Sequence, residues 1–311
     1  MNVELRHLRY FLAVADELHF GRAAEELHIA QPALSQQIQK LESMLGTVLL
    51  RRTSRSVALT PAGVVFRDRA RAILRQSARD LAEVVRVGRG EQGRLDVGFV
   101  SSALHLGPIE HVERFRRRHR GVEVVLHEGF TTQLLARVVR GEIDVATVRD
   151  PDPLPGITTV ALVTEPFVAI VPADHRLAAQ DVVTGAQLAG DKFVFYPRTA
   201  GERAHHLNLL PVTETGRRPD IVQEASNWAT IIYLIGAGLG VSIAPASATV
   251  AAPDNVRVLR LHGTAAESTL HLAGRTDEAS AVVRNFLDSP WPSTTLSGTR
   301  PPGSGRSSRT R

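Results

Sequence analysis

Residues 31–42 constrain this chain most, because their pattern predicts a helix with two very different faces. Leu34, Ile38 and Leu41 recur at helical spacing and form an apolar side that must be buried. The other side carries amides and a hydroxyl instead of a run of charges: Gln31, Pro32, Ser35, Gln36 and Gln39. Such groups can hydrogen-bond to base edges in a DNA major groove, although an ordinary solvated helix face has the same composition.

The residues before this helix predict two shorter helices, at 5–17 and near 22–27. The pair Ala23-Ala24 is small enough to let two helices cross closely. Gln31 stands where an N-cap is expected and Pro32 at the first helical position, where a missing N–H costs nothing. Three short helices with a tight second connection predict a helix-turn-helix unit.

A β-hairpin wing is predicted directly after this unit. Two short β-prone runs, 48–50 and 57–59, enclose a polar turn. The arginines expected to contact phosphates or enter a minor groove are Arg51, Arg52 and Arg55. A solvated hairpin tip is the alternative interpretation of the same residues.

The next predicted helix is long and suits self-association. Thr60 caps it, Pro61 takes its first position, and its periodicity continues to about residue 87. Its apolar residues approximate a heptad seam, and the candidate dimer contacts are Phe66, Ile73, Leu81 and Val84. Glycines at 88, 90 and 93 then indicate a hinge between domains.

Residues 4–63 resemble the DNA-binding region of LysR-type transcriptional regulators. The matching motifs, in unbroken order, are the Leu5–Phe11 opening, Ala23-Ala24, Ala30 to Ser35, Leu41-Glu42, Leu45-Gly46, the Arg-rich wing and Thr60 to Gly63. The resemblance implies an all-α winged helix-turn-helix, a dimerising linker helix and a C-terminal ligand-sensing domain. Many members carry Arg where this chain has Gln36; Arg favours guanine and an amide favours adenine.

Beyond the hinge, predicted strands and helices alternate, which indicates an α/β domain with parallel pairing. Two lobes, between which the chain crosses twice, are the expected arrangement, and this resembles the periplasmic-binding-protein-like sensor of the same family. We place the winged helix-turn-helix at 1–60, the linker and hinge at 61–91, and the sensor at 92–290. Within the sensor, lobe I takes about 92–163 and 268–290, lobe II about 164–267, and residues 291–311 form a disordered basic tail.

Ligands of such folds bind near strand C-termini and helix N-termini. The polar residues expected at these points are Ser101, Ser102, Thr131, Thr132, Arg149 and, from the second lobe, Pro197 and Arg198. Hydroxyls, helix N–H groups and an arginine in one cleft would favour a carboxylate. Helix capping and a surface ion pair for Arg149 are the alternative. Similar regulators of aromatic catabolism bind small carboxylates with Ser and Thr at the positions matching Ser102 and Thr131.

Composition narrows the remaining possibilities. The chain has no cysteine, which excludes disulfides and thiolate chemistry, and its net charge of +5 permits nucleic-acid binding. We see no signal peptide and no apolar run of about 20 residues, so we expect a cytoplasmic protein without membrane contact. The adjacent His205 and His206 point to different sides of a helix, and we expect neither a metal nor a cofactor.

The predicted function is a transcription regulator, not an enzyme, that binds double-stranded DNA and responds to a small organic-acid effector. A homodimer follows from the linker helix, a homotetramer from the resemblance alone, and RNA polymerase is a candidate partner. The alternative is a small-molecule-binding protein or enzyme with an unrelated N-terminal helical domain.

Overall fold

The computed structural model of the protein describes residues 3–53 and 56–292. The chain divides into two compact units between Arg86 and Val87. Each unit is described by itself. Within the described residues, none of the helices has both the length and the apolar character that crossing a bilayer requires.

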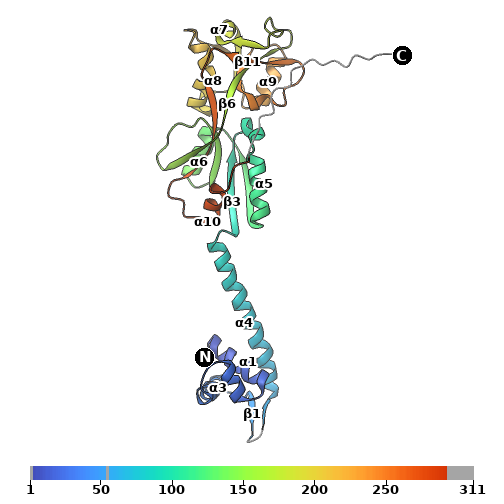
Figure 1. Ribbon diagram of the computed structural model, residues 1–311, viewed down its shortest axis with the longest axis vertical. Helices are drawn as coiled ribbons and strands as arrows, with labels where there is room; N and C mark the ends of the chain where they lie inside the picture. The colour runs from blue at the N-terminus through green and yellow to red at the C-terminus, as the bar shows by residue number, and fades with distance from the viewer. Residues whose placement is uncertain (1–2, 54–55, 293–311) are drawn as a thin grey trace, which may run out of the picture. The chain divides into compact units, whose positions relative to one another are not determined.

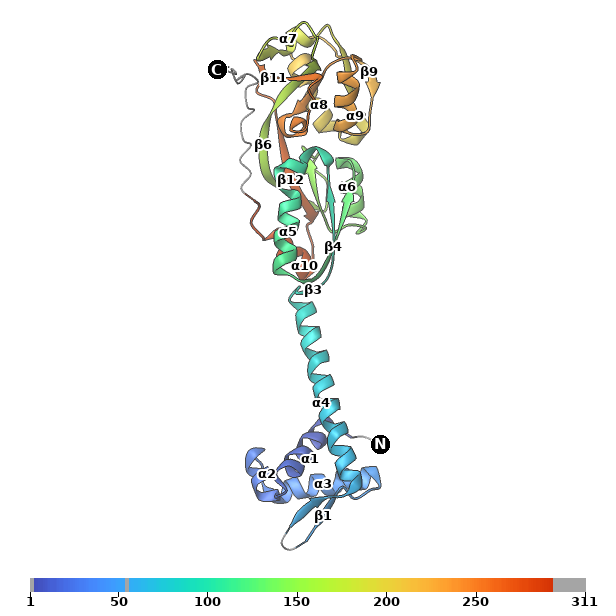
Figure 2. The ribbon, with the colours of Figure 1, turned by 90° about the vertical axis from the view of Figure 1, so that its right-hand side faces the viewer.

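The N-terminal unit is a three-helix core with a hairpin and one long helix (Figures 1 and 2). Its elements are α1 (Leu5–Glu17), α2 (Phe20–Glu26), α3 (Gln31–Leu45), β1 (Leu50–Arg52), β2 (Val57–Leu59) and α4 (Pro61–Gly88). Phe11, Ala23, Leu34 and Ile38 are completely buried in one cluster. The apolar stripe of α3 therefore faces the core, and the small Ala23 lets α2 pack closely, as predicted.

Three predicted boundaries in this unit were wrong. The second helix begins at Phe20, because the His19 side chain caps the N–H groups of Gly21 and Arg22. The third helix begins at Gln31 itself, with Ala30 as its N-cap. The strand β1 begins at Leu50 and not at residue 48, so Arg51 and Arg52 belong to the strand and not to the turn.

The start of α4 is fixed against the wing by two residues. The Thr60 hydroxyl accepts the N–H of Gly63 at 2.9 Å and donates to the carbonyl of Val48 at 2.8 Å. A Cβ on Gly63 would lie 2.1 Å from the Leu49 carbonyl oxygen. Only glycine allows this approach, so the Thr-Pro-Ala-Gly sequence both caps the helix and packs it on the hairpin.

The C-terminal unit is built on one mixed sheet in the order β4-β3-β5-β12-β6-β11-β7, with β10 also paired to β6. Its strands are β3 (Gln92–Phe99), β4 (Gly121–Glu128), β5 (Val145–Arg149), β6 (Ile157–Pro172), β7 (Val182–Thr184), β8 (Lys192–Phe195), β9 (Asp220–Glu224), β10 (Ser242–Pro245), β11 (Val256–His262) and β12 (Glu267–Arg275). Strands β3, β4 and β5 pair in parallel, as predicted, while β12 runs antiparallel to β5.

Helices connect these strands, and β8 and β9 form a separate two-stranded sheet. They are η1 (Ser101–Leu106), α5 (Pro108–Arg118), α6 (Thr131–Val139), α7 (Gly185–Leu188), η2 (Arg198–Ala200), α8 (Glu202–Thr213), α9 (Trp228–Gly236), η3 (Ala246–Thr249) and α10 (Ala281–Leu287). Gly107, with φ of 93°, separates η1 from α5.

Strand β6 joins the two lobes, as Figures 1 and 2 show. Its first part, up to Pro166, pairs with β12, and from Phe167 onward it pairs with β10 and β11. Pro166 has no N–H to donate, and it stands where the strand changes partners. The buried apolar clusters divide at the same place, with Val163 in one and Phe167 in another.

Two residues of the predicted tail, Trp291 and Pro292, belong to the described part of the chain. Trp291 is ordered: its Nε1–H donates to the Leu106 carbonyl at 3.0 Å, and its ring lies 4.7 Å from that of His111. The rest of the expected disordered tail, 293–311, lies outside the described residues.

Candidate functional site

The structure exposes the amide-rich face of α3. Gln31, Pro32, Gln36 and Gln39 are exposed, and Ser35 is half-buried. The opposite face, including Leu34, Ile38 and Leu41, is buried in the core. The sequence pattern is therefore confirmed as a two-faced helix whose polar side is free to meet a partner.

The wing arginines differ in their surroundings. Arg51 is exposed on β1, opposite Ala58 of β2. Arg52 is directed toward the helices, where its guanidinium contacts Ser35 and Glu42. Arg55 lies outside the described residues. The strand geometry thus places Arg52 against the helix-turn-helix, and its expected contact with a phosphate or a minor groove stays a prediction.

A second candidate site is a pocket between the two lobes of the C-terminal unit, with an open space of about 530 Å³. Lobe I contributes Ser101, Ser102, Thr131 and Arg149, four of the residues predicted from the sequence. Lobe II contributes residues that the sequence analysis did not select: Tyr196, Ala200, Gly201, Ala204, Asn208, Ser226, Asn227, Trp228, Ile231 and Pro245.

Helix N-termini meet at this pocket. Thr131 is the first residue of α6, Gly201 is the N-cap of α8, and Asn227 is the N-cap of α9. The first N–H groups of a helix have no partner inside the helix, and the helix dipole is positive at this end. The pocket therefore offers neutral donors and a positive potential to an anion.

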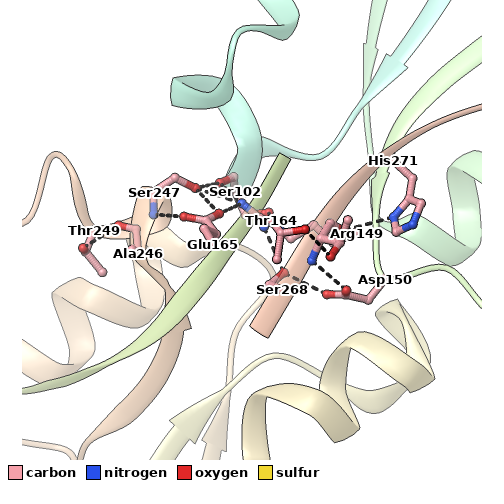
Figure 3. Close-up of polar contacts among 11 residues, drawn as sticks. Ser102, Arg149, Asp150, Thr164, Glu165, Ala246, Ser247, Thr249, Ser268 and His271 are labelled. Carbon is pink, nitrogen blue, oxygen red and sulfur yellow. Dashed lines mark hydrogen bonds and ion pairs between the residues drawn. The ribbon is translucent and has the colours of Figure 1, made fainter. Parts of the chain in front are cut away.

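Arg149 lines this pocket, but its charge is paired within the protein. Its guanidinium is buried and forms an ion pair of 2.6 Å with Glu165, whose side chain is completely buried (Figure 3). Ser102, Ser247 and Ser268 occupy other edges of the guanidinium at 2.8 to 2.9 Å. The alternative of an ion pair is the correct one, except that the pair is buried and not at the surface.

This cluster connects lobe I with the second lobe. Glu165 lies in β6, and its second carboxylate oxygen accepts the N–H of Ser247 in η3 at 2.6 Å. The Ser247 hydroxyl also donates to the Ser102 carbonyl in η1 at 3.1 Å. Figure 3 shows these side chains between η1, β6 and η3. Arg149 thus lines the pocket and also links the two lobes, because its Nε, Nη1 and Nη2 all donate to acceptors within the protein.

Two groups beside this cluster, Asp150 and Tyr196, have pKa values above their ordinary ones. Burial raises the pKa of Asp150, against hydrogen bonds from Thr269 N–H and the Ser268 hydroxyl that favour its charged form. Burial also raises the pKa of Tyr196, and the nearby Asp150 adds to the effect. The Tyr196 phenol is therefore neutral and available as a hydrogen-bond donor at the pocket.

The remaining predicted effector residues lie elsewhere. Thr132 is exposed and does not line the pocket. Pro197 lies one residue beyond the lining, and Arg198 is exposed and pairs with Glu202 in the next turn of chain. The prediction failed here because it took the residues just after Tyr196, whereas Tyr196 itself faces the ligand space.

Some missed residues left a signal in the sequence. Asn227 before the apolar helix at Trp228 is an N-cap pattern, and its side chain does accept the Thr230 N–H. Glu165 is a lone acid inside an apolar run, which indicates a buried charge with a partner. The Glu165 pattern does not identify its partner, because Arg149 lies 16 residues earlier in the chain.

Comparison with known proteins agrees with this geometry. Residues 5–64 match the bacterial regulatory helix-turn-helix protein, lysR family, and residues 88–289 match the LysR substrate binding domain. The chain belongs to the LysR family of transcriptional regulators. Its two units are therefore the DNA-binding helix-turn-helix domain and the effector-binding domain of such a regulator.

Individual LysR-family proteins align over nearly the whole chain. The HTH-type regulator YnfL of Escherichia coli is 40% identical over 288 residues, which cover 92% of this chain and 97% of YnfL. The Hca operon transcriptional activator HcaR of the same species is 37% identical over 291 residues, covering 92% and 96%. Full-length CbnR complexed with its target DNA is 26% identical, with a TM-score of 0.75, covering 92% and 97%.

Proposed function

We propose that this LysR-family regulator binds an interrupted DNA dyad as a homo-oligomer and that a small organic acid, held between the lobes, changes its activity. The observation that carries the first half is the exposed amide face of α3 beside a basic hairpin. A recognition helix flanked by a wing is a geometry that places side chains on base edges and phosphates together. The structure of the related CbnR with its target DNA supports this use.

On DNA, we assign base readout to the exposed side of α3 and phosphate contact to the wing. The readers are Gln31, Pro32, Ser35, Gln36 and Gln39, and the phosphate contacts are Arg51 and Arg55. Because Gln36 is an amide, an adenine is the expected partner at its position. Gln36→Ala should change which base is preferred there and leave the other positions unaltered.

In the pocket, we assign the effector carboxylate to the N-termini of α6 and α9 and to Ser101, Ser102 and Thr131. Arg149 contributes no free charge, since Glu165 neutralises it. The apolar part of the effector would contact Tyr196 and Trp228. A small carboxylate with an apolar body therefore fits better than a polyanion, which would need unpaired cations.

Oligomerisation is assigned to α4. Ile73, Leu81 and Val84 are 48%, 63% and 69% exposed, respectively, and they repeat along one long helix. Burying them against a second copy would remove apolar surface from water. A homodimer follows; a homotetramer and contact with RNA polymerase rest on likeness to the family.

We retain the domain boundaries at 60, 91 and 290 and the lobe crossings near 163/164 and 267/268. The buried clusters support the crossings, because Val163 and Leu270 pack in lobe I and Phe167 and Ala266 in lobe II. We assign no catalytic reaction to the chain, in keeping with the regulators that it resembles.

A gel shift on the intergenic DNA beside the chain's own gene tests the proposal. A discrete complex that competitor DNA of random sequence does not remove is the expected result. Failure to retard this DNA at micromolar protein and moderate salt would favour the alternative, a small-molecule-binding protein with an unrelated helical domain.

A further inference from the structure

One guanidinium joins three elements of the DNA-binding unit. Arg52, the last residue of β1, donates from Nη1 to Ser35 Oγ at 3.0 Å and from Nη2 to Glu42 Oε2 at 3.4 Å. Its Cζ also lies 4.5 Å from the ring centroid of Phe20 at the start of α2. The Arg52 side chain is only 27% exposed, so most of it is held by the protein before any DNA arrives.

The acceptor at Glu42 is itself fixed. Its other carboxylate oxygen accepts the backbone N–H groups of Leu49 and Leu50 at 2.8 and 3.0 Å, and its side chain is 14% exposed. The carboxylate thus binds the wing strand to α3 at two backbone groups and one guanidinium. The two backbone bonds are charge-assisted and hold the carboxylate in place, which makes Glu42 a fixed acceptor for Arg52.

The consequence falls on Ser35. Ser35 and Glu42 are seven residues apart, about two helical turns, so both side chains project from the same side of α3. The Ser35 oxygen accepts from Arg52, and its own O–H remains available to donate. Arg52 therefore presents Ser35 as a hydrogen-bond donor with a fixed oxygen position.

We propose that Arg52 is a positioning residue for DNA recognition, which orients Ser35 as a donor to an acceptor on the DNA and does not itself neutralise a phosphate. This inference rests on the proposed DNA-binding function. It separates Arg52, whose guanidinium contacts Ser35, Glu42 and Phe20, from Arg51, its neighbour on the same strand. Of these two adjacent arginines, Arg52 would then position Ser35 and Arg51 would contact a phosphate.

Salt dependence distinguishes the two roles, because each neutralised phosphate adds about 0.9 to the slope of log K against log salt concentration. The experiment measures the affinity of the full chain for its own operator by fluorescence anisotropy at several salt concentrations. The variants are Arg52→Ala, Arg52→Lys and, as the matched control, Arg51→Ala. Thermal unfolding of each variant confirms that the N-terminal unit is folded.

The expected result has three parts. Arg52→Ala weakens operator binding about tenfold or more, the loss typical of a good base contact, with an unchanged salt slope. Arg52→Lys does not restore affinity, because one ammonium cannot bond Ser35 and Glu42 as the planar fork does. Arg51→Ala lowers the slope by about one, as a phosphate contact should.

A double-mutant cycle with Ser35→Ala adds a second readout. If Arg52 acts through Ser35, the loss caused by Arg52→Ala shrinks in the Ser35→Ala background. The inference is overturned if Arg52→Ala lowers the salt slope by about one and Arg52→Lys restores binding. It is also overturned if the two losses simply add. If the wild-type chain itself binds no operator, the proposed function fails, and the role of Arg52 on DNA fails with it.

Discussion

At the scale of single residues, the buried pair of Arg149 and Glu165 makes the sharpest energetic prediction. Both side chains are almost completely buried, at 6% and 0% exposure. Glu165→Ala leaves a buried guanidinium without its counter-charge, and removing one partner of such a pair costs about 3–5 kcal/mol. Urea denaturation of the full chain, followed in the C-terminal unit, measures the loss.

The matched control is the ion pair of Arg198 and Glu202, which is 70% and 64% exposed. Arg198→Ala should change the free energy of unfolding by less than about 1 kcal/mol, as exposed pairs do. Equal losses from the buried and the exposed pair would contradict the account of the link between the lobes.

The buried imidazole of His111 is expected to make the free energy of unfolding depend on pH. Burial lowers its pKa below the ordinary value of 6.5, and its Nε2 lies 3.1 Å from the Ser289 hydroxyl. The unfolded chain therefore takes up a proton below about pH 6.5 that the folded chain resists, so this contribution to stability is present above pH 6.5 and is lost as the pH falls below it.

The measurement is the denaturation midpoint of wild type and of His111→Phe between pH 5 and 8. The wild type should lose stability toward pH 5 more steeply than the variant, whatever the variant's stability at pH 8. Parallel pH profiles for the two proteins would refute the assignment to His111.

The outcome at Arg149 shows what single residues reveal before a structure is known. Its place after a strand correctly predicted a position at the pocket, because strand ends meet at one edge of a sheet. Its partner Glu165 is distant in the chain, and the pairing depends on how β6 and β5 are separated by β12. The sequence shows that Arg149 carries a positive charge, but it does not show that Glu165 pairs with that charge in the fold.

At the scale of elements, α4 packs on the core of the N-terminal unit near its start and carries the proposed dimer contacts further along. The sequence analysis assigned residues of both regions to the dimer contacts. Phe66 was predicted to join a dimer seam, but its ring packs edge-on against Phe11 of the same unit, with centroids 4.9 Å apart. Phe66→Ala should destabilise the N-terminal unit by about 3 kcal/mol, as large-to-small core substitutions do. Thermal unfolding that is unchanged by this substitution would show that Phe66 is not part of the core.

Leu81, 63% exposed, tests the other function of α4. Leu81→Glu places a charge in the proposed seam and should shift the chain from dimer to monomer while the unfolding of each unit stays nearly unchanged. Analytical ultracentrifugation at micromolar concentration measures the shift. An unaltered dimer would move the interface away from α4.

The sequence predicted helices and strands correctly where apolar residues recur at regular spacing, and it misplaced the first residues of several of them. The buried stripe of α3, with Leu34, Ile38 and Leu41, follows from regular apolar spacing. The start of α2 was missed because His19, an uncommon cap, supplies the acceptor. The start of β1 was missed because the Glu42 side chain accepts the N–H groups of Leu49 and Leu50, and β-propensity does not reveal such a side-chain contact.

At the scale of the whole molecule, effector binding should appear as a gain in stability. A ligand that binds only the folded chain adds about 2.7 kcal/mol at a concentration of 100 times its Kd. A thermal-shift screen should therefore find small carboxylates with an apolar body, and their neutral amides should have a much smaller effect. A screen in which amides and acids raise the midpoint equally would contradict anion binding at the helix N-termini.

Substitutions inside and outside the pocket test whether the ligand that raises the thermal stability binds there. Thr131→Ala should reduce the ligand-induced shift while operator binding stays intact, since Thr131 is in the pocket wall and its hydroxyl bonds to the Arg149 carbonyl at 3.2 Å. Arg198→Ala, outside the pocket, is the control and should keep the full shift. Loss of the shift in both variants would place the effector elsewhere.

The central claim is that the exposed face of α3 reads a DNA sequence. The most direct test is the ratio of the affinities of the full chain for its operator and for a scrambled duplex of equal length, at about 0.15 M salt. Specific regulators typically favour their site by about 10³ or more, and Gln36→Ala should reduce this ratio by changing the preferred base. Equal affinity for both duplexes, explained entirely by salt-dependent attraction, would contradict the claim.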